Sequence, residues 1–419
     1  MSRTSQSPPP VLDDMSRDEL LQVAREKEAA LHDAEARAST AEKRCTGRHN
    51  QCAAQKTPEA RTPRADDEEK DPADLARQAG TLYGLTKGMW LVMSAEKTMA
   101  VKLDDGYKEE TRFAKRTNRI QGELRDVVEV LPEDLHSQRT KTWVADKFKE
   151  GLHNQRWNTA SRVRHDISAV FRTHIDTGAT NEDGTKKEIH AEDLLDSTTR
   201  ASWAHLIGGK RNRNNKMEYE VFDAPVLHGD FSDSFNAKTF LDSKLVMHVA
   251  AAFLYGPSKA VFLATGKGTV SANAVMADIH QITHTTPGLV ANAAIYTLWT
   301  LSNNNTLRET GTQTGINWQT HHQNILEYLL NGVRQRKAGI LKLFHAWDDV
   351  LFPDTETGIG SVSGGSSSSA GSGGRRRALD ALDAMPSVEP EDEEENETQH
   401  NEEQHDEEQH DEEQHDTKD

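Results

Sequence analysis

The chain has 419 residues, enough for one large domain or two ordinary ones, but only 35% of them are hydrophobic. Its formal net charge of −18 is unevenly placed, because residues 361–419 carry 4 basic and 19 acidic side chains and so hold 15 of those negative charges. Residues 72–360 carry 34 side chains of each sign, and this neutral balance argues against a strongly basic, nucleic-acid-binding core.

The sequence contains no export or membrane signal. Its first residues, MSRTSQSPPPVLDD, lack the apolar stretch of a secretory signal, and no window approaches 18 consecutive apolar residues. Both cysteines, Cys45 and Cys52, precede the expected core, so disulfide bonds are excluded as its framework. We therefore expect an intracellular protein, in the nucleus or the cytoplasm, that is neither secreted nor bound to a membrane.

Residues 1–70 form a polar N-terminal segment with one predicted helix. Ser16 and Glu19 make a capping box, and apolar positions then recur at alternating spacings of four and three residues as far as Cys45. Alanine fills most of these positions, so the repeat buries little area. A lone charged helix and a weak coiled coil are both compatible with residues 16–45.

Residues 71–355 are predicted to form a single, mainly α-helical core domain. Asp71 is a helix cap and Pro72 occupies the first helical position. Apolar residues at helical spacing predict further helices within 118–131, 140–152, 159–175, 242–256, 288–302 and 322–352. Trp299 and Trp347 are expected in the core. A short strand pair is expected near residues 219–227, and no alternation of strands and helices indicates a doubly wound sheet.

Residues 356–419 are predicted to be a disordered linker and tail. The linker GIGSVSGGSSSSAGSGG precedes three arginines, and pentads of the type HDEEQ begin at His400. Such a composition cannot bury enough apolar surface to offset the entropy of ordering. A solvated acidic tail is the expected state, with weak binding of metal ions by its four histidines as the alternative.

The stretch LYGPSKAVFLATGKGTVSANA, residues 254–274, has the glycines and the lysine of a phosphate-binding loop but not their order. A nucleotide loop needs a glycine, four residues and then Gly-Lys-Ser/Thr, whereas here Gly266, Lys267, Gly268 and Thr269 have no glycine at the required distance before them. We predict a polar connector between the helix that ends near Tyr255 and the helix that starts after Pro287. No cofactor is expected.

His280 and His284 are the candidate metal ligands. Their spacing of four residues would place both imidazoles on one side of a helix, as in zinc sites. Gln281 stands where a zinc protease of this pattern has its glutamate base, so that hydrolytic mechanism is disfavoured. Core histidines at 321, 322 and 345 could join them in a metal-dependent enzyme.

Two basic clusters remain, GGKRNRNNK at residues 208–216 and GRRR at residues 374–377. The first offers few cations and little aromatic surface, so nucleic acid is an unlikely partner. The second is a weak match to a nuclear localisation signal.

The C-terminal half of the core resembles a domain of unknown function from mushroom-forming basidiomycete fungi. The resemblance rests on KLVMHVAAAFLYGPSKA, GTVSANA, the pair Ile279-His280, TTPGLVANAAIYTLWTLS and LFHAWDDVLFP, in that order, and covers roughly residues 140–353. It implies a domain boundary and no particular chemistry.

The sequence thus favours a non-enzymatic binding or interaction module with a protein partner. No catalytic residues are identified. The alternative is a metal-dependent or nucleic-acid-processing enzyme that uses His280, His284 and other core histidines.

Overall fold

The computed structural model describes residues 71–166, 171, 191–266, 275–353 and 373–387. Contacts divide the chain between Glu69 and Lys70, and every described residue belongs to the second part. The described residues are mainly α-helical with one antiparallel strand pair, which confirms the predicted fold class. The helix or coiled coil expected at residues 16–45 lies outside them.

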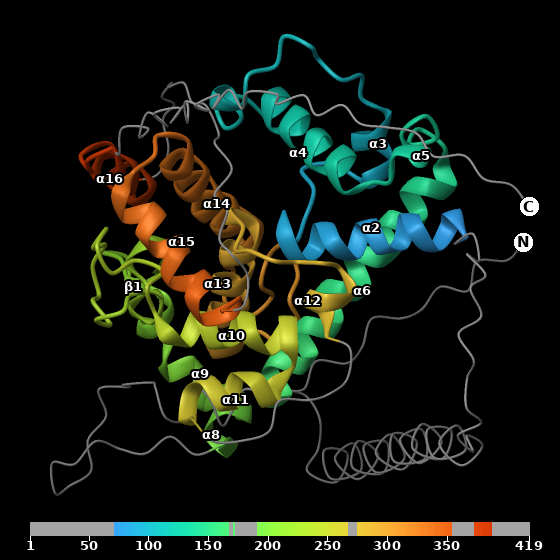
Figure 1. The fold of residues 1–419 in the computed structure, drawn as a ribbon. Coiled ribbons are helices and arrows are strands. Elements are labelled where there is room, and N and C mark those ends of the chain that lie inside the picture. The colour runs from blue at the N-terminus through green and yellow to red at the C-terminus, as the bar shows by residue number, and fades with distance from the viewer. Residues whose placement is uncertain (1–70, 167–170, 172–190, 267–274, 354–372, 388–419) are drawn as a thin grey trace, which may run out of the picture. The chain divides into compact units, whose positions relative to one another are not determined.

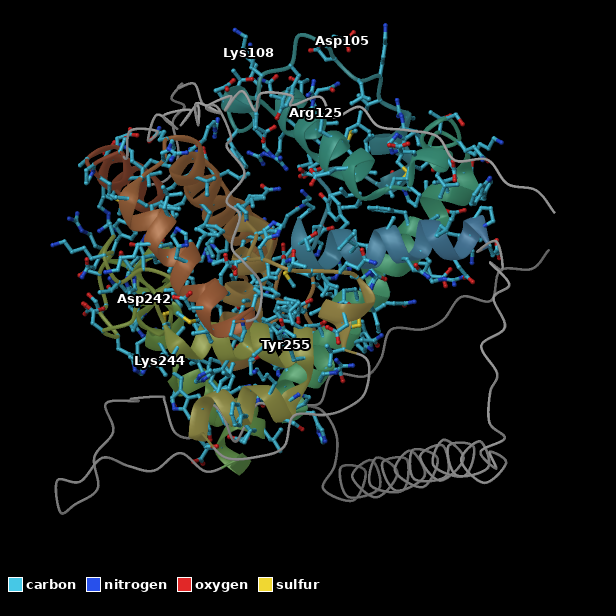
Figure 2. All side chains as sticks on the ribbon, viewed as in Figure 1. Asp105, Lys108, Arg125, Asp242, Lys244 and Tyr255 are labelled. Atoms are coloured by element: carbon cyan, nitrogen blue, oxygen red, sulfur yellow. The ribbon has the colours of Figure 1, made fainter. Side chains whose placement is uncertain are left out.

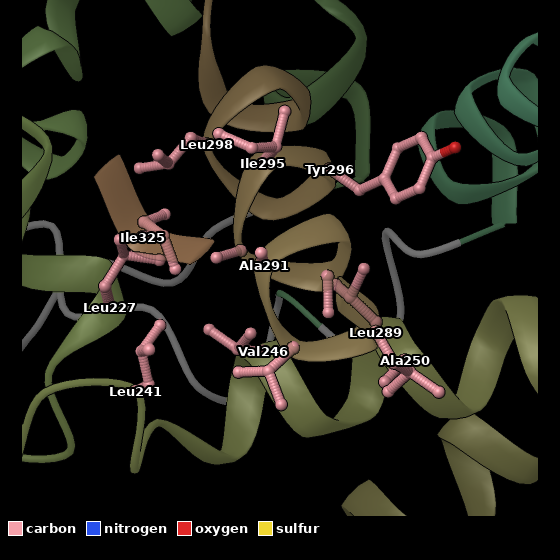
Figure 3. Close-up of a cluster of buried hydrophobic side chains, with 14 of the residues drawn as sticks. Leu227, Leu241, Val246, Ala250, Leu289, Ala291, Ile295, Tyr296, Leu298 and Ile325 are labelled. Atoms are coloured by element: carbon pink, nitrogen blue, oxygen red, sulfur yellow. The ribbon is translucent and has the colours of Figure 1, made fainter. Parts of the chain in front are cut away.

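Helix α13 (Pro287–Leu301) is the centre of this part of the chain (Figure 1). Every residue from Gly288 to Leu301 is buried, as expected for a helix that is apolar on all sides. Four helices pack against it: α2 (Pro72–Thr86), α6 (Thr142–Asp166), α10 (Lys244–Tyr255) and α14 (Trp318–Arg334). Figure 3 shows Leu289 and Ala291 of α13 beside Val246 and Ala250 of α10.

The remaining helices cover this arrangement. Short α3 (Ala95–Ala100), α4 (Arg116–Val130) and α5 (Glu133–His136) follow α2, and the crossing of α2 with α6 places Tyr83 against Phe148 with ring centroids 5.5 Å apart. The other elements are η2 (Glu109–Thr111), α8 (Ala191–Leu195), α9 (Ser197–Ser202), η3 (Ala204–Ile207) and α15 (Ala338–Leu351). Trp299 and Trp347 are 2% and 0% exposed, which confirms their predicted place in the core.

The strand pair lies earlier than predicted. Strand β1 (Gly209–Arg211) pairs with β2 (Met217–Tyr219), whereas residues 221–227 form two 3-10 turns, η4 (Val221–Asp223) and η5 (Pro225–Leu227). Consecutive residues Val221 and Phe222 are both fully buried, so the alternation of a half-buried strand is absent. Pro225 also lacks the N–H that a strand ladder needs.

The predicted connector between α10 and α13 contains two helices. Pro257 opens α11 (Pro257–Thr265) at its first position, and a second, short helix is α12 (Met276–Ile279). Gly266 ends α11 in the left-handed conformation, with φ of 67°. The glycine of the Gly-Lys-Gly-Thr run is therefore a helix cap, and Lys267 lies outside the described residues.

Helix α16 (Gly373–Asp383) corrects the expectation of an unstructured chain from residue 356 onward. Its Ala378 and Leu382 are fully buried against the rest of the core. The guanidinium of Arg375 donates two hydrogen bonds to the carboxylate of Glu327 in α14, one of them at 2.6 Å. The amphipathic run RRRALDALDAM supplies the apolar face that a Gly/Ser composition lacks.

The C-terminal end of α2 is held by side chains of α13. The amide nitrogen of Asn292 donates to the carbonyls of Gly84 and Leu85 at 3.1 Å each, and the Thr286 hydroxyl donates to the carbonyl of Thr86 at 2.6 Å. These carbonyls belong to the last turn of α2, where a helix has no N–H donors of its own to offer them. A Cβ at Gly288 would lie 2.3 Å from the Thr86 oxygen, so only glycine permits this approach.

Replacing Asn292 by alanine is expected to lower the free energy of unfolding by about 3 kcal/mol, because the buried carbonyls of α2 and the imidazole of His322 lose their partner. Urea denaturation followed by far-ultraviolet circular dichroism measures this. Asn154→Ala, at an exposed position of α6, is the control and should change stability by no more than about 0.5 kcal/mol. Equal stabilities of the two variants would contradict the role given to Asn292.

Deleting residues 361–419 is expected to destabilise the core, whereas deleting only 388–419 should not. The longer deletion removes the buried Leu382 and leaves Glu327, 6% exposed, without its arginine. A loss of about 3 kcal/mol would lower the melting temperature by roughly 6 °C or more. Equal melting temperatures for the two truncated chains would show that α16 contributes nothing to stability.

Candidate anion-binding cleft

Helix α4 begins with an uncapped, positively charged turn. Its first residue is Arg116, and the preceding Lys115 is extended and makes no side-chain hydrogen bond to the helix start. The first N–H groups of a helix have no acceptors within it and carry a partial positive charge. The loop before this turn carries further exposed charges, including Asp105 and Lys108 (Figure 2).

A cleft of about 480 Å³ lies over this helix start. Its walls come from three places in the chain: the start of α4, the first turns of α14, and α16. Four cationic side chains line it: Lys115, Arg116, Arg119 and Arg375. Gln319 and Gln323 of α14 add amide groups, and Val92, Phe113 and Ala114 complete the lining.

The cations of the cleft outnumber the carboxylates that pair with them. Arg375 is bound to Glu327, and Arg119 donates to Gln323 at 2.6 Å while its buried Nε has no partner among the described residues. Burial lowers the pKa of Arg119. Lys115 and Arg116 are exposed and form no ion pair with a described residue. The cleft therefore has an excess of positive charge that an anion can neutralise.

A small inner chamber of about 10 Å³, room for a single water molecule, adjoins the cleft and shares Phe113, Arg119 and both glutamines with it. Its Glu123 is 5% exposed and accepts the Val92 N–H at 2.8 Å. Burial raises the pKa of Glu123 to about 7. Trp90 is 7% exposed, and its Nε1 has no partner among the described residues.

The chamber is closed by a buried arginine and a buried histidine. Arg112 pairs with Asp126 of α4 and with Glu109 at 3.0 Å. Burial alone would lower the pKa of Arg112, but the two carboxylates raise it well above its usual value. His322 shares a hydrogen bond of 2.9 Å with Asn292, and burial lowers its pKa to about 3, which keeps it neutral.

The two predicted metal ligands do not share a helix face. Helix α12 ends at Ile279, His280 follows as its cap, and Gln281 has φ of 52°, so His284 leaves the helix. Burial lowers the pKa of His280, and Nδ1 of His284 lies 3.4 Å from the hydroxyl of Thr283. Across the described residues, no group of three or more His, Cys, Asp or Glu could hold a metal. The placement of both imidazoles on one side of a helix, which the spacing predicted, is therefore absent. Metal binding by this pair stays a prediction.

The basic cluster at residues 208–216 comprises β1 and the turn that leads to β2, and it is not part of the cleft. Lys210 pairs with Asp223 at 3.2 Å, and Arg211 binds the side chain and carbonyl of Asn215. In contrast, Arg375 of the run GRRR lines the cleft. Sequence reasoning missed this site because residues 115–119 and 375 are far apart in the chain.

An apolar groove of about 230 Å³ is a further hollow in the described part of the chain. Trp157 and Leu195 on its rim are 55% and 57% exposed, and the Arg164 guanidinium lies 3.6 Å from the centroid of the Trp299 ring. Its lining is mainly apolar, so it is chemically distinct from the cleft.

Within the described residues, none of the helices is both long and apolar enough to span a membrane.

The buried Glu123 is expected to make stability depend on pH. Between its usual value of 4.5 and the folded value of about 7, the folded protein keeps a proton that the unfolded chain has released. The folded state then binds more protons, so the free energy of unfolding falls as the pH rises through this window. Glu123→Gln removes the ionisation and should exceed the native chain in stability by about 3 kcal/mol at pH 8, with little difference at pH 4.5.

Urea titrations at a series of pH values test this expectation. Glu129→Gln is the control, because Glu129 is an exposed carboxylate of the same helix whose pairing with Lys87 contributes no more than about 1 kcal/mol. A Glu123→Gln chain that is less stable than the native one at pH 8 would mean that an ionised Glu123 is held by Arg112 and Arg119.

A model of a family of unknown function (DUF6698) matches residues 150–352. No curated protein and no solved structure matches the chain. The match starts within α6 and ends after α15, so it includes α13 and the two glutamines of the cleft. The four cations of the cleft lie outside it. The matched residues are nearly those of the resemblance found in the sequence, which covers roughly residues 140–353, while a fungal origin stays a prediction.

Proposed function

We propose that this protein is a binding module that holds an acidic or phosphorylated segment of a partner protein in the cleft at the start of α4. The observation that carries the proposal is the unbalanced charge of the cleft. Lys115 and Arg116 have no carboxylate partner among the described residues, and Arg119 has a buried Nε without an acceptor. A bound anion is stabilised both by such cations and by the free N–H groups at the start of a helix.

The size of the cleft favours a segment over a free ion. About 480 Å³ is within the range of sites that hold a molecule of many atoms, and a lone phosphate would leave most of this volume to water. Gln319 and Gln323 can donate and accept hydrogen bonds and so suit the backbone of an extended segment. Carboxylate and phosphate groups both match the planar guanidinium groups of Arg116 and Arg119.

A protein partner is favoured over nucleic acid. Sequence-independent affinity for nucleic acid grows with the number of phosphates neutralised, and the cleft offers four cations, one of which is already paired. Single strands also need exposed aromatic rings for stacking, whereas Phe113, the aromatic residue of the cleft, is 8% exposed.

The rival reading, an enzyme that uses core histidines, has less support. His322 is committed to Asn292 at 2.9 Å, and His280 and His284 do not lie on a common helix face. The buried Glu123 is likewise occupied by the Val92 N–H. His322 and Glu123 are thus hydrogen-bonded within the fold, whereas a catalytic side chain must reach its substrate.

Lys115→Ala/Arg116→Ala is expected to weaken binding of an anionic peptide about tenfold, or ~1.4 kcal/mol. The probe is a short fluorescein-labelled peptide with one phosphoserine between glutamates, and binding is measured by fluorescence anisotropy. The matched control is Lys149→Ala/Arg162→Ala, which removes the same charge from exposed positions of α6. The same peptide with plain serine, and competition by inorganic phosphate, distinguish acidic from phosphorylated segments.

Two outcomes would overturn the proposal. Equal weakening by the cleft pair and by the α6 pair would show that the probe senses overall charge and not the cleft. Tighter binding of a single-stranded oligonucleotide than of the peptide, lost in the cleft variant, would assign the site to nucleic acid.

A further inference from the structure

We infer that the cleft also accepts the protein's own acidic tail, residues 388–419, which then competes with the partner segment. This inference rests on the proposed function, since it assumes that the cleft takes anionic segments. The tail is an occupant that is always present, and its competition controls the access of the partner segment to the cleft.

The charges of tail and cleft are complementary. Residues 388–419 contain 17 acidic side chains and a single lysine, a net charge of −16 before any histidine is protonated. Seven of the acids fall within residues 389–397, immediately after the last described residue. The cleft presents Lys115, Arg116 and Arg119 without carboxylate partners among the described residues.

Helix α16 fixes where the tail begins. It runs parallel to α14, because Arg375 near its start binds Glu327 in the middle of α14 while Lys337, just after α14, donates to the carbonyls of Asp383 and Met385. Ser387 then forms a bridge with Lys337. The tail therefore starts beside the C-terminal end of α14, and the cleft lies at the opposite, N-terminal end of the same helix.

The tail is long enough to cover this distance. Helix α14 has 17 residues and so spans about 25 Å at 1.5 Å per residue. Eight extended residues after Ser387 reach about 26 Å, so Glu395, Glu397 and the acids that follow them can arrive at the cleft.

A tethered segment needs little intrinsic affinity to occupy a nearby site. A short flexible tether gives an effective concentration in the millimolar range, so a contact with a dissociation constant of about 1 mM is already substantially populated. Because Arg375 belongs both to the helix that anchors the tail and to the wall of the cleft, the tether and the site are parts of one unit.

The test uses the phosphoserine–glutamate peptide as the probe and first compares three full-length proteins. They are the native chain, a chain whose tail acids at residues 389–416 are replaced by their amides, and this amide chain with Lys115→Ala/Arg116→Ala. Neutralising the tail should tighten probe binding about tenfold, and the cleft substitutions should abolish that gain. A fourth protein carries the unchanged tail together with Lys115→Ala/Arg116→Ala. It completes the double-mutant cycle and controls for general repulsion between the tail and the probe.

A second probe separates the inference from the proposed function. A labelled synthetic peptide of residues 388–419 is titrated onto a chain that ends at Ser387, with and without Lys115→Ala/Arg116→Ala. Binding that depends on the cleft residues supports the inference even if the phosphoserine peptide fails to bind. An unchanged probe affinity after the tail is neutralised, or a gain that persists in the cleft variant, would overturn it and leave the proposed function standing. Tail binding that ignores the cleft residues would place the tail elsewhere.

Discussion

The last carbonyl groups of α2 are satisfied by the side chains of α13, and the rest of the described structure depends on this contact. A helix end buried in a core must find acceptors and donors there, because water cannot reach it. Asn292 and Thr286 supply the donors for Gly84, Leu85 and Thr86, while the other end of the Asn292 amide binds His322 of α14. One buried amide thus joins three helices.

The cleft is a product of how three distant segments meet. The first turns of α14 lie within residues 150–352, which match the family of unknown function, whereas the cations come from α4 and α16 on either side of that region. The matched region therefore supplies a neutral wall with two amide groups, and its flanks supply the charge. A relative that retains the matched helices but differs in these flanks would keep the fold and lose the electrostatic character of the site.

The C-terminal region combines two kinds of sequence with different physical roles. Residues 373–387 hold enough apolar side chains to dock, with Ala378 and Leu382 fully buried and Arg375 paired to Glu327. Residues 388–419 contain 17 acidic side chains and, apart from Val388 and Pro390, no apolar ones to bury. A short docked helix thereby starts a highly charged segment at the C-terminal end of α14, whereas the cleft of opposite charge lies at the N-terminal end of that helix. Average composition over residues 356–419 conceals this division.

Sequence alone determined the helical class and the burial of Trp299 and Trp347, because periodicity in apolar residues reports directly on which face a helix must hide. It placed the strand pair some residues late and overlooked α11 and α16, whose short apolar faces are visible only against the surfaces that cover them. Only the tertiary structure decided the candidate site. Lys115, Arg116, Arg119 and Arg375 are unremarkable as separate surface cations, and their excess charge exists only once packing brings them together while leaving acidic residues elsewhere. The helical spacing of His280 and His284 was lost for the converse reason, since a backbone turn at Gln281 overrides a pattern of four residues.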